Sequence, residues 1–320
     1  MIRVLAALSV AVVCVALFPT DAFAWTPGTH VYLAETVLAN LGQLPPAIAD
    51  LLRAFPFDFL YGNIAADTSI AKRYAAVGRH SHFWHVGQEI HDQAESDAVR
   101  AFGLGYLAHL AADVVAHNHF VPRQLMITSS TASFGHSYWE TRVECHLGDA
   151  YARAAKDVIL LDHAQANAHL DRLISPTIFS VRTNRRLFRG MVRLTDTESW
   201  QRAAQAARAR SRWDLADADV ERHLALSYEY VVDVLADRSP AARELDPSGE
   251  APLTTAKRRR REVLRHTGRR DREQLRAMAE ESFGLPRADL SHWPRLARRL
   301  PWHAPEGTAP SPRLLAASDE

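Results

Sequence analysis

The chain has 320 residues, with 38 Lys and Arg against 37 Asp and Glu, and a formal net charge of +1. This balance argues against a globally electropositive surface of the kind that binds nucleic acids. The length suits one large or two small domains with a sizeable core. The two cysteines are Cys14 and Cys145, and Cys14 lies in an N-terminal segment that we expect to be removed. We therefore expect no intramolecular disulfide.

Residues 1–24 have the pattern of a secretory signal peptide. Arg3 precedes an apolar run from Val4 to Leu17, and Ala22-Phe23-Ala24 has small residues at the two positions that define a cleavage site. The apolar run is shorter than the about 20 residues that a bilayer-spanning helix needs. We expect cleavage before Trp25, export of the mature protein to the periplasm or the extracellular space, and no transmembrane segment in the mature chain.

From residue 25 onward, apolar residues recur at helical spacing and strand signals are sparse. The first predicted helix starts near Pro27 and stops at Gly42, because proline suits a first helical turn and glycine suits a helix end. In chain order, further helices are predicted over residues 45–55, 93–118, 136–153, 158–174, 196–209, 214–237, 255–266, 270–282 and 289–299. These segments lack the alternating β-branched runs of strands. The periodicity therefore predicts an all-α fold.

The C-terminal half is rich in Arg and Ala, and one of its segments is strongly basic. Residues 257–276 contain ten Lys or Arg against three acids. Such a run is usually the solvated face of a helix, but it can also bind an anionic membrane surface or nucleic acid. Residues 301–320 are rich in proline, and we expect them to form a disordered tail.

Histidines gather in the N-terminal half of the chain, where ten of the sixteen fall between residues 30 and 146. They are His30, His80, His82, His85, His91, His109, His117, His119, His136 and His146. Imidazole is a common metal ligand. The clustering therefore directs attention to a metal site.

The central motif lies in GYLAHLAADVVAHNHFVP, residues 105–122. His109 and Asp113 are four residues apart, so on a helix they share a face and can hold one cation, while the two oxygens of Asp113 can bridge two metals. His117 continues the same stripe, whereas His119 points about 120° away from Asp113. A single-metal site favours His117, and a second metal beside the first favours His119.

Other candidate ligands flank this motif. His136 and Glu140 in GHSYWE are again four residues apart. Upstream, Asp67 lies in the turn-like segment YGNIAAD, and His82 follows fifteen residues later within HSHFWH. His30 stands five residues after Trp25. These positions extend the candidate site over more than a hundred residues of sequence.

Each piece taken alone has an ordinary explanation. Polar pairs four residues apart are common stabilisers of surface helices, and His80, His85 and His91 can be ordinary partly buried or solvated histidines. The apolar context AFGLGYLAHLAADVV, however, would bury His109 and Asp113, and buried polar groups need partners. The combination therefore favours a metal site.

The order and spacing of these residues resemble the zinc-dependent phospholipase C family and the related secreted single-strand-specific nucleases. In that superfamily the mature chain begins with Trp, a His follows shortly after, and an Asp precedes a His by about fifteen residues. Then come His-x-x-x-Asp, a His six residues past that Asp, and His-x-x-x-Glu or His-x-x-x-Asp. The corresponding residues are Trp25, His30, Asp67, His82, His109, Asp113, His119, His136 and Glu140.

The resemblance implies three zinc ions. The first would be held by Asp67, His82, His109 and Asp113. The second would be held by His119, His136 and Glu140. The third would be held by the terminal amine and carbonyl of Trp25, by His30 and by the other oxygen of Asp113. On this basis His119 is preferred to His117, while His80, only two residues from His82, stays a rival for that ligand.

The resemblance also implies a function. Residues 25–175 would form a phospholipase C-like catalytic domain in an all-α bundle, with residues 176–300 as additional helices that either continue it or stand apart. Asp67 would be the catalytic residue that orients a water and accepts its proton. The expected reaction is cleavage of a phospholipid phosphodiester by a metal-activated hydroxide. The alternatives are a single-strand nuclease or 3'-nucleotidase and a non-catalytic zinc-binding protein.

The substrate head group is left open. In the phospholipase branch a choline is held at positions that correspond here to Gly28, Thr68 and Arg79, so the choline pocket is not reproduced. Arg79 can instead pair with an anionic head group or a phosphate.

Overall fold

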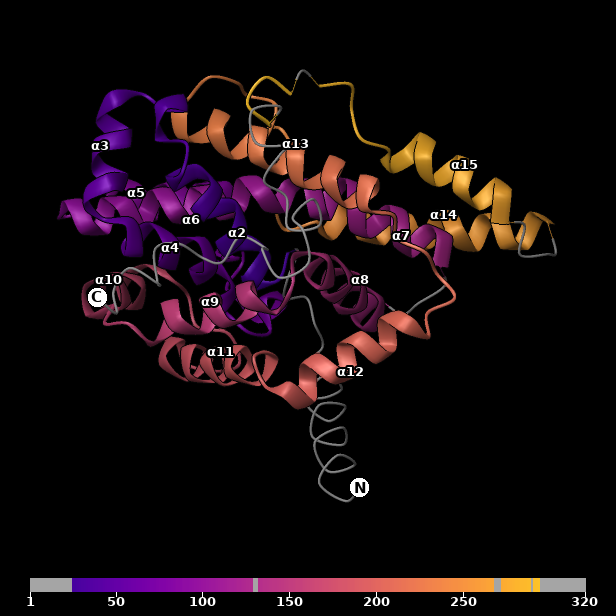
Figure 1. Cartoon of the computed structure of the whole chain (residues 1–320), viewed down its shortest axis with the longest axis horizontal. Helices are drawn as coiled ribbons and strands as arrows, with labels where there is room; N and C mark the ends of the chain where they lie inside the picture. The colour runs from indigo at the N-terminus through magenta and orange to yellow at the C-terminus, as the bar shows by residue number, and fades with distance from the viewer. Residues whose placement is uncertain (1–24, 129–131, 268–271, 289, 294–320) are drawn as a thin grey trace.

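A computed structural model describes residues 25–128, 132–267, 272–288 and 290–293, and the regular structure in these ranges is helical, without a strand (Figure 1). The helices are α2 (Pro27–Leu38), α3 (Pro46–Ala54), α4 (Pro56–Ala65), α5 (Trp84–Asp92), α6 (Asp97–Val115), α7 (Val121–Thr128), α8 (Ala132–Leu147), α9 (Asp149–Leu160), α10 (Ala164–Leu173), α11 (Val181–Thr195), α12 (Glu198–Ala209), α13 (Asp217–Ala236), α14 (Glu250–Thr267) and α15 (Arg272–Phe283). The prediction of an all-α fold is confirmed.

Helix α6 is the central element of the fold. Every residue from Ala101 to Val115 is buried, because α4, α5 and α13 pack along it. The helix continues through a π-helical turn, Ala116–Phe120, into α7. Among the described residues, Asp97–Thr128 is long and apolar enough to cross a membrane, and 89% of its apolar window is buried inside the fold. The apolar composition of this segment is therefore explained by its position in the core.

Two glycines allow α4 and α6 to approach each other closely. A Cβ atom at Gly62 would collide with the backbone oxygen of Phe102, and a Cβ atom at Gly105 would collide with that of Phe59. This contact brings the turn that follows α4, which contains the buried Asp67, against the middle of α6. Helix packing thus places the upstream candidate ligand beside the central motif.

The C-terminal helices share the core with the N-terminal ones. Buried apolar residues of α13 belong to the same cluster as those of α2, α4 and α6, and the Glu229 side chain accepts hydrogen bonds from the backbone N–H groups of His292 and Trp293. Helices α14 and α15 pack against α7 (Figure 1), over a second apolar cluster that includes Met126 and Leu275. The C-terminal region therefore covers the end of the central helix.

Several predicted helices are confirmed with small shifts at their ends. The helix expected from Pro27 is α2, and the segments 45–55, 93–118, 196–209, 214–237, 255–266 and 270–282 correspond to α3, α6, α12, α13, α14 and α15. In α3, α13 and α15, buried apolar residues recur at helical spacing, which is the pattern that periodicity detects, whereas α12 has no buried residue.

Other boundaries differ from the prediction. The periodicity does not predict α4, α5 or α11. The predicted helix over 136–153 is interrupted at Gly148, whose φ of 89° is a conformation that glycine adopts at no steric cost. Residues 290–293 of the predicted segment 289–299 contain no α-helix. The expected signal peptide and the expected disordered tail lie outside the described residues.

Candidate metal centre

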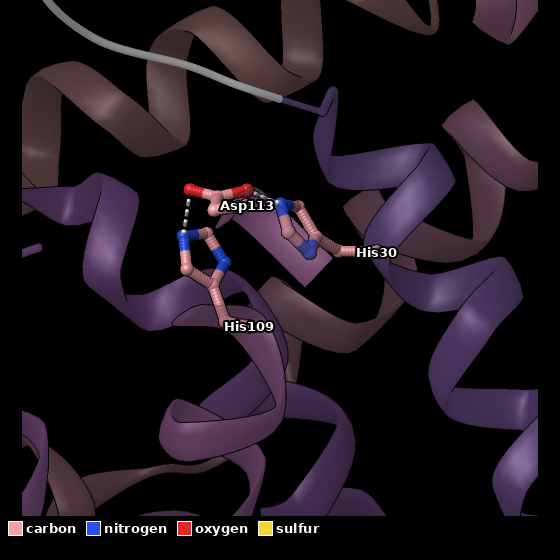
Figure 2. Close-up of side chains that lie close together, drawn as sticks. All are labelled: His30, His109 and Asp113. Atoms are coloured by element: carbon pink, nitrogen blue, oxygen red, sulfur yellow. Dashed lines mark ion pairs between the residues drawn. The ribbon is translucent and has the colours of Figure 1, made fainter. Parts of the chain in front are cut away.

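Asp113 lies between histidines from three different parts of the chain. Its Oδ1 is 3.1 Å from His30 Nε2, while its Oδ2 is 3.0 Å from His82 Nε2 and 3.1 Å from His109 Nε2. Figure 2 shows His30 and His109 directed at opposite ends of the carboxylate. The two oxygens therefore face different imidazoles, as a carboxylate that bridges two cations requires.

Asp67 completes one group of potential ligands. Its Oδ1 is 3.3 Å from His82 Nε2 and 3.9 Å from His109 Nε2. All three side chains are at most 1% exposed, and their nearest donor atoms lie within 4.8 Å of one another, as do those of the second group formed by His30, His109 and Asp113. Both groups meet at His109, on the buried face of α6.

Hydrogen bonds outside the cluster orient two of its histidines. His109 Nδ1 lies 2.7 Å from the backbone oxygen of Asn63 on α4, so Nδ1 carries a proton and Nε2, 3.1 Å from Asp113 Oδ2, is the atom that can bind a metal. This second contact is typical of histidines that bind metals. The Tyr106 hydroxyl donates to the backbone oxygen of Ser81 at 2.7 Å, which fixes the segment containing His82 against α6.

The cluster contains buried polar atoms without hydrogen bonds. They are His30 Nδ1 and Asp67 Oδ2, while His30 Nε2 and both oxygens of Asp113 contact only each other or the imidazoles in the ion pairs given above. Because buried polar atoms are almost always paired, a shared cation is the simplest partner for this set. Nitrogen and oxygen donors without a thiolate suit zinc at a catalytic type of site, where positions stay open for water and substrate.

The pKa values of His30 and Asp113 suit metal binding. Burial lowers the pKa of His30, and the neighbouring His109 lowers it further. Burial acts to raise the pKa of Asp113, but His109 and His30 outweigh it and hold that pKa well below its usual value. An anionic carboxylate beside a neutral imidazole, as at Asp113 and His30, is the combination that metal ligation needs. Burial acts to lower the pKa of His109, but the charges of Asp113 and Asp67 outweigh it and raise that pKa, so a metal at His109 would displace a proton.

His136 and Glu140 form a second pair on α8. His136 Nε2 is 2.7 Å from Glu140 Oε1, and both residues are buried. Burial raises the pKa of Glu140 well above its usual value, and the charges of Asp67 and Asp113 raise it further. The pair therefore lies within electrostatic reach of the first cluster.

The structure brings His117, rather than His119, to this pair. The rings of His117 and His136 are 5.2 Å apart, and those of His117 and His82 are 6.4 Å apart. His119 Nδ1 instead faces the backbone oxygen of Gly284, at 3.1 Å. The helix continues through residues 116–120, so the residue four after Asp113 stays on the site face and the residue six after it turns towards α15. The resemblance implied His119 as a ligand of this set; in the structure it is His117 whose ring lies near His136, and the choice of ligand stays a prediction.

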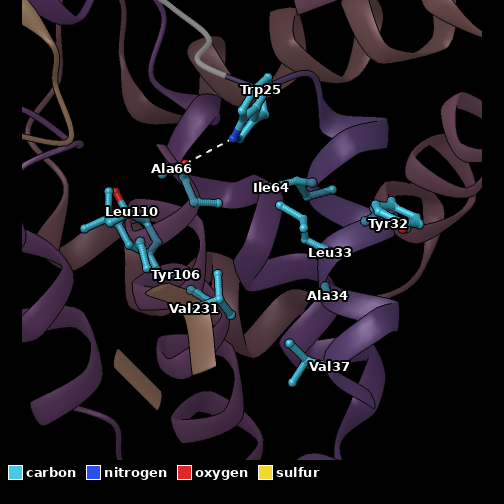
Figure 3. Close-up of a cluster of buried hydrophobic side chains, with 14 of the residues drawn as sticks. Trp25, Tyr32, Leu33, Ala34, Val37, Ile64, Ala66, Tyr106, Leu110 and Val231 are labelled. Carbon is cyan, nitrogen blue, oxygen red and sulfur yellow. Dashed lines mark hydrogen bonds between the residues drawn. The ribbon is translucent and has the colours of Figure 1, made fainter. Parts of the chain in front are cut away.

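Trp25 stands directly before α2, the helix that carries His30. It is fully buried and belongs to the same apolar cluster as Leu33 and Ile64 (Figure 3). Its indole Nε1 donates to the backbone oxygen of Ala112 at 3.1 Å, one residue before Asp113. Its role as a terminal-amine ligand stays a prediction, because that role depends on cleavage within the undescribed N-terminal segment.

Two alternatives from the sequence have other partners. His80 Nδ1 accepts a hydrogen bond from the backbone N–H of His82, and burial, followed by the neighbouring His82 and Lys72, lowers its pKa to about 2. Arg79 pairs with Glu89 at 2.5 Å and donates to the backbone oxygen of Leu173. The structure thus places His82, and not its rival, in the cluster, and it gives Arg79 a structural partner.

Lys72 is a member of the cluster that sequence reasoning missed. It is 1% exposed, and its Nζ lies 2.8 Å from Asp67 Oδ1 and 3.0 Å from His82 Nε2. A single lysine in a turn matches no motif, and its burial depends on contacts with distant residues. The local sequence therefore does not predict that Lys72 lies in the cluster.

A cavity of about 460 Å³ adjoins the cluster. Its lining residues are Lys72, Arg73, Ala75, Ala76, Val77, Gly78, His80, Phe83, His136, Ser248, Glu250, Leu253, Thr254 and Lys257. Three of these side chains are cationic and one is acidic, so the lining favours an anionic occupant. One wall comes from the start of α14, far from the ligands in sequence.

Comparison with known proteins gives a family match. Residues 29–185 match the family described as zinc dependent phospholipase C. Neither the curated proteins nor the solved structures give a match. The matched range runs from α2 into α11 and contains every side chain of the two ligand groups, with His136 and Glu140. Through residues 29–185, the chain belongs to the zinc-dependent phospholipase C family.

Proposed function

We propose that the protein is a phosphodiesterase that hydrolyses a phospholipid with the help of bound zinc. Family membership supports a zinc-dependent, phospholipase C-like hydrolase. The observation that supports zinc-assisted hydrolysis of a phosphodiester is the position of Asp113, whose two oxygens face separate sets of imidazoles. Two close cations are typical of sites that displace a group at phosphorus in line.

The proposed ligands form three sets. The first is Asp67, His82, His109 and Asp113. The second is His117, His136 and Glu140, with His117 in the place that the resemblance gave to His119. The third is His30 with the other oxygen of Asp113 and, after cleavage, the backbone amine and carbonyl of Trp25. Three zinc ions would occupy these sets.

Bound zinc would supply a hydroxide at neutral pH and neutralise charge on the phosphate. The chain's own carboxylate at Asp67 would orient the attacking water and take its proton. Its Oδ2 is buried and has no hydrogen-bond partner in the described structure, so one oxygen of this carboxylate can accept a proton while Oδ1 faces His82. General bases need this kind of access to the proton that they remove.

The cavity beside the second pair supports a phosphate ester as substrate. Lys72, Arg73 and Lys257 line it, against the single acid Glu250. Cationic side chains recognise phosphate through charge-assisted hydrogen bonds. Because the start of α14 lies outside the matched residues 29–185, we propose that this helix contributes to the choice of head group.

We also propose that the protein is exported, as the pattern of residues 1–24 predicts, and meets anionic membranes through α14. In the basic run of that helix, Arg258, Arg261 and Arg265 are exposed, whereas Arg260 donates to the backbone oxygen of Met126. Exposed arginines near a membrane attract anionic lipids. Sedimentation with anionic but not neutral vesicles, weakened by salt, is the expected result; equal binding to both would contradict this role.

The proposed reaction can be tested with two substrates on one sample. Purified protein is incubated with a short-chain phospholipid and, separately, with single-stranded DNA, with and without a chelator. We expect release of diacylglycerol that stops with the chelator and returns with added zinc. Cleavage of DNA alone would contradict the phospholipid proposal, and the absence of both reactions in zinc-loaded protein would contradict hydrolysis of either ester.

A further inference from the structure

Lys72 occupies an unusual place for a lysine. Its side chain is 1% exposed, and its Nζ contacts Asp67 Oδ1 and His82 Nε2 at 2.8 and 3.0 Å. Ala71, just before it, has a left-handed φ of 58°, which is uncommon for a residue with a Cβ. The chain thus turns sharply where it buries this ammonium. A buried charge is costly unless it is paired, and the Asp67 carboxylate provides the pairing.

The two atoms that Lys72 contacts are also atoms that a metal at the first ligand set would use. Asp67 Oδ1 and His82 Nε2 lie together with His109 Nε2 in one potential metal group. The nitrogen lone pair of His82 cannot serve an ammonium and a zinc ion at the same time. Two cations at such a distance also repel each other strongly in a buried site. With the metal in place, Lys72 Nζ must therefore point elsewhere.

The adjoining cavity offers the place to which it can turn. Lys72 lines this cavity together with His136 and Lys257, and its flexible four-carbon side chain can redirect the ammonium. A cation beside bound zinc is stable when an anion lies between them. A phosphate group is such an anion, because its non-bridging oxygens can face the metals and the ammonium together.

We propose that Lys72 binds the phosphate of the substrate, with its ammonium against a non-bridging oxygen in the cavity. This inference rests on the proposed phosphodiesterase function and names one residue that would recognise the phosphate. A fixed cation at this position favours the charge that develops on phosphorus oxygens during attack. The same contact would hold free inorganic phosphate, which allows binding to be measured without turnover.

The test compares zinc-loaded wild type with Lys72→Met, which keeps the length of the side chain and removes its charge. Lys156→Met is the matched control, because Lys156 lies on α9 and pairs with Asp196, outside the cluster. Zinc content is measured first, then the affinity for inorganic phosphate by calorimetry, and then kcat and KM on a short-chain phospholipid. If Lys72→Met does not fold, Lys72→Gln, which keeps a donor for Asp67, replaces it.

We expect Lys72→Met to keep its zinc and to bind phosphate about 10-fold to 100-fold more weakly, as expected for loss of a charge-assisted hydrogen bond, with a lower kcat. Lys72→Arg should recover part of the phosphate affinity, and Lys156→Met should behave like wild type. Unchanged phosphate affinity in Lys72→Met would overturn the proposal, and so would loss of zinc from that variant. If wild type hydrolyses no phospholipid, the proposed function fails, while calorimetry with phosphate still decides the role of Lys72.

Discussion

Replacing His117 by Gln removes the imidazole that lies 5.2 Å, ring to ring, from His136. If His117 is the third side chain of the second ligand set, the variant should lose zinc from that set. Changes to groups that merely support metal ligands cost about 10-fold to 100-fold in metal affinity. Loss of a ligand should therefore cost at least about 100-fold, which corresponds to about 2.7 kcal/mol at 1.36 kcal/mol per factor of ten.

His119→Gln is the matched control, two residues away on the same helix. His119 Nδ1 contacts the backbone oxygen of Gly284 at 3.1 Å, so its loss should cost about 1 kcal/mol of folding stability and leave zinc in place. Zinc per chain, measured after equilibration at buffered free zinc, separates the two variants, and thermal unfolding measures the loss in stability. Loss of zinc from His119→Gln with full zinc in His117→Gln would refute the assignment drawn from the structure.

Asp113→Asn should lose zinc and phospholipid hydrolysis together, because Asp113 faces both ligand groups; a variant that retains both by metal analysis and assay would rule out the bridging role. Gly105→Ala should lower the free energy of unfolding by about 1–3 kcal/mol, measured by denaturant titration, since the added Cβ collides with the Phe59 backbone oxygen; wild-type stability would contradict the close α4–α6 contact. Burial raises the pKa of Glu35 to about 7, so ionisation of Glu35 should reduce stability as the pH rises from about 4.5 through 7. Glu35→Gln should therefore gain on the order of 2 kcal/mol over wild type near pH 8 and little near pH 5 in thermal unfolding, and a larger gain near pH 5 would contradict this sign.

Spacing along one helix predicted the centre of the site well. His109 and Asp113 are four residues apart, and the apolar residues around them indicate burial, so their meeting on a buried face followed from local geometry. The choice between His117 and His119 did not follow in the same way. The resemblance placed a ligand six residues after Asp113, at His119. In the structure, His117, four residues after Asp113, lies beside His136.

Contacts between distant segments could not be read from the sequence. The burial of Lys72 depends on a turn packed against α6, and the cavity wall from α14 depends on how the C-terminal helices cover α7. Helix α4 was also missed, since its residues are buried on several sides and show no single apolar face. In these cases tertiary packing, rather than periodicity, decides the structure.

Zinc content, measured together with phospholipid hydrolysis on the same exported protein, tests the central claim most directly. The account predicts near three zinc ions per chain and release of diacylglycerol that a chelator abolishes and added zinc restores. Protein that binds no zinc, or that hydrolyses phospholipid equally well after complete chelation, would contradict it.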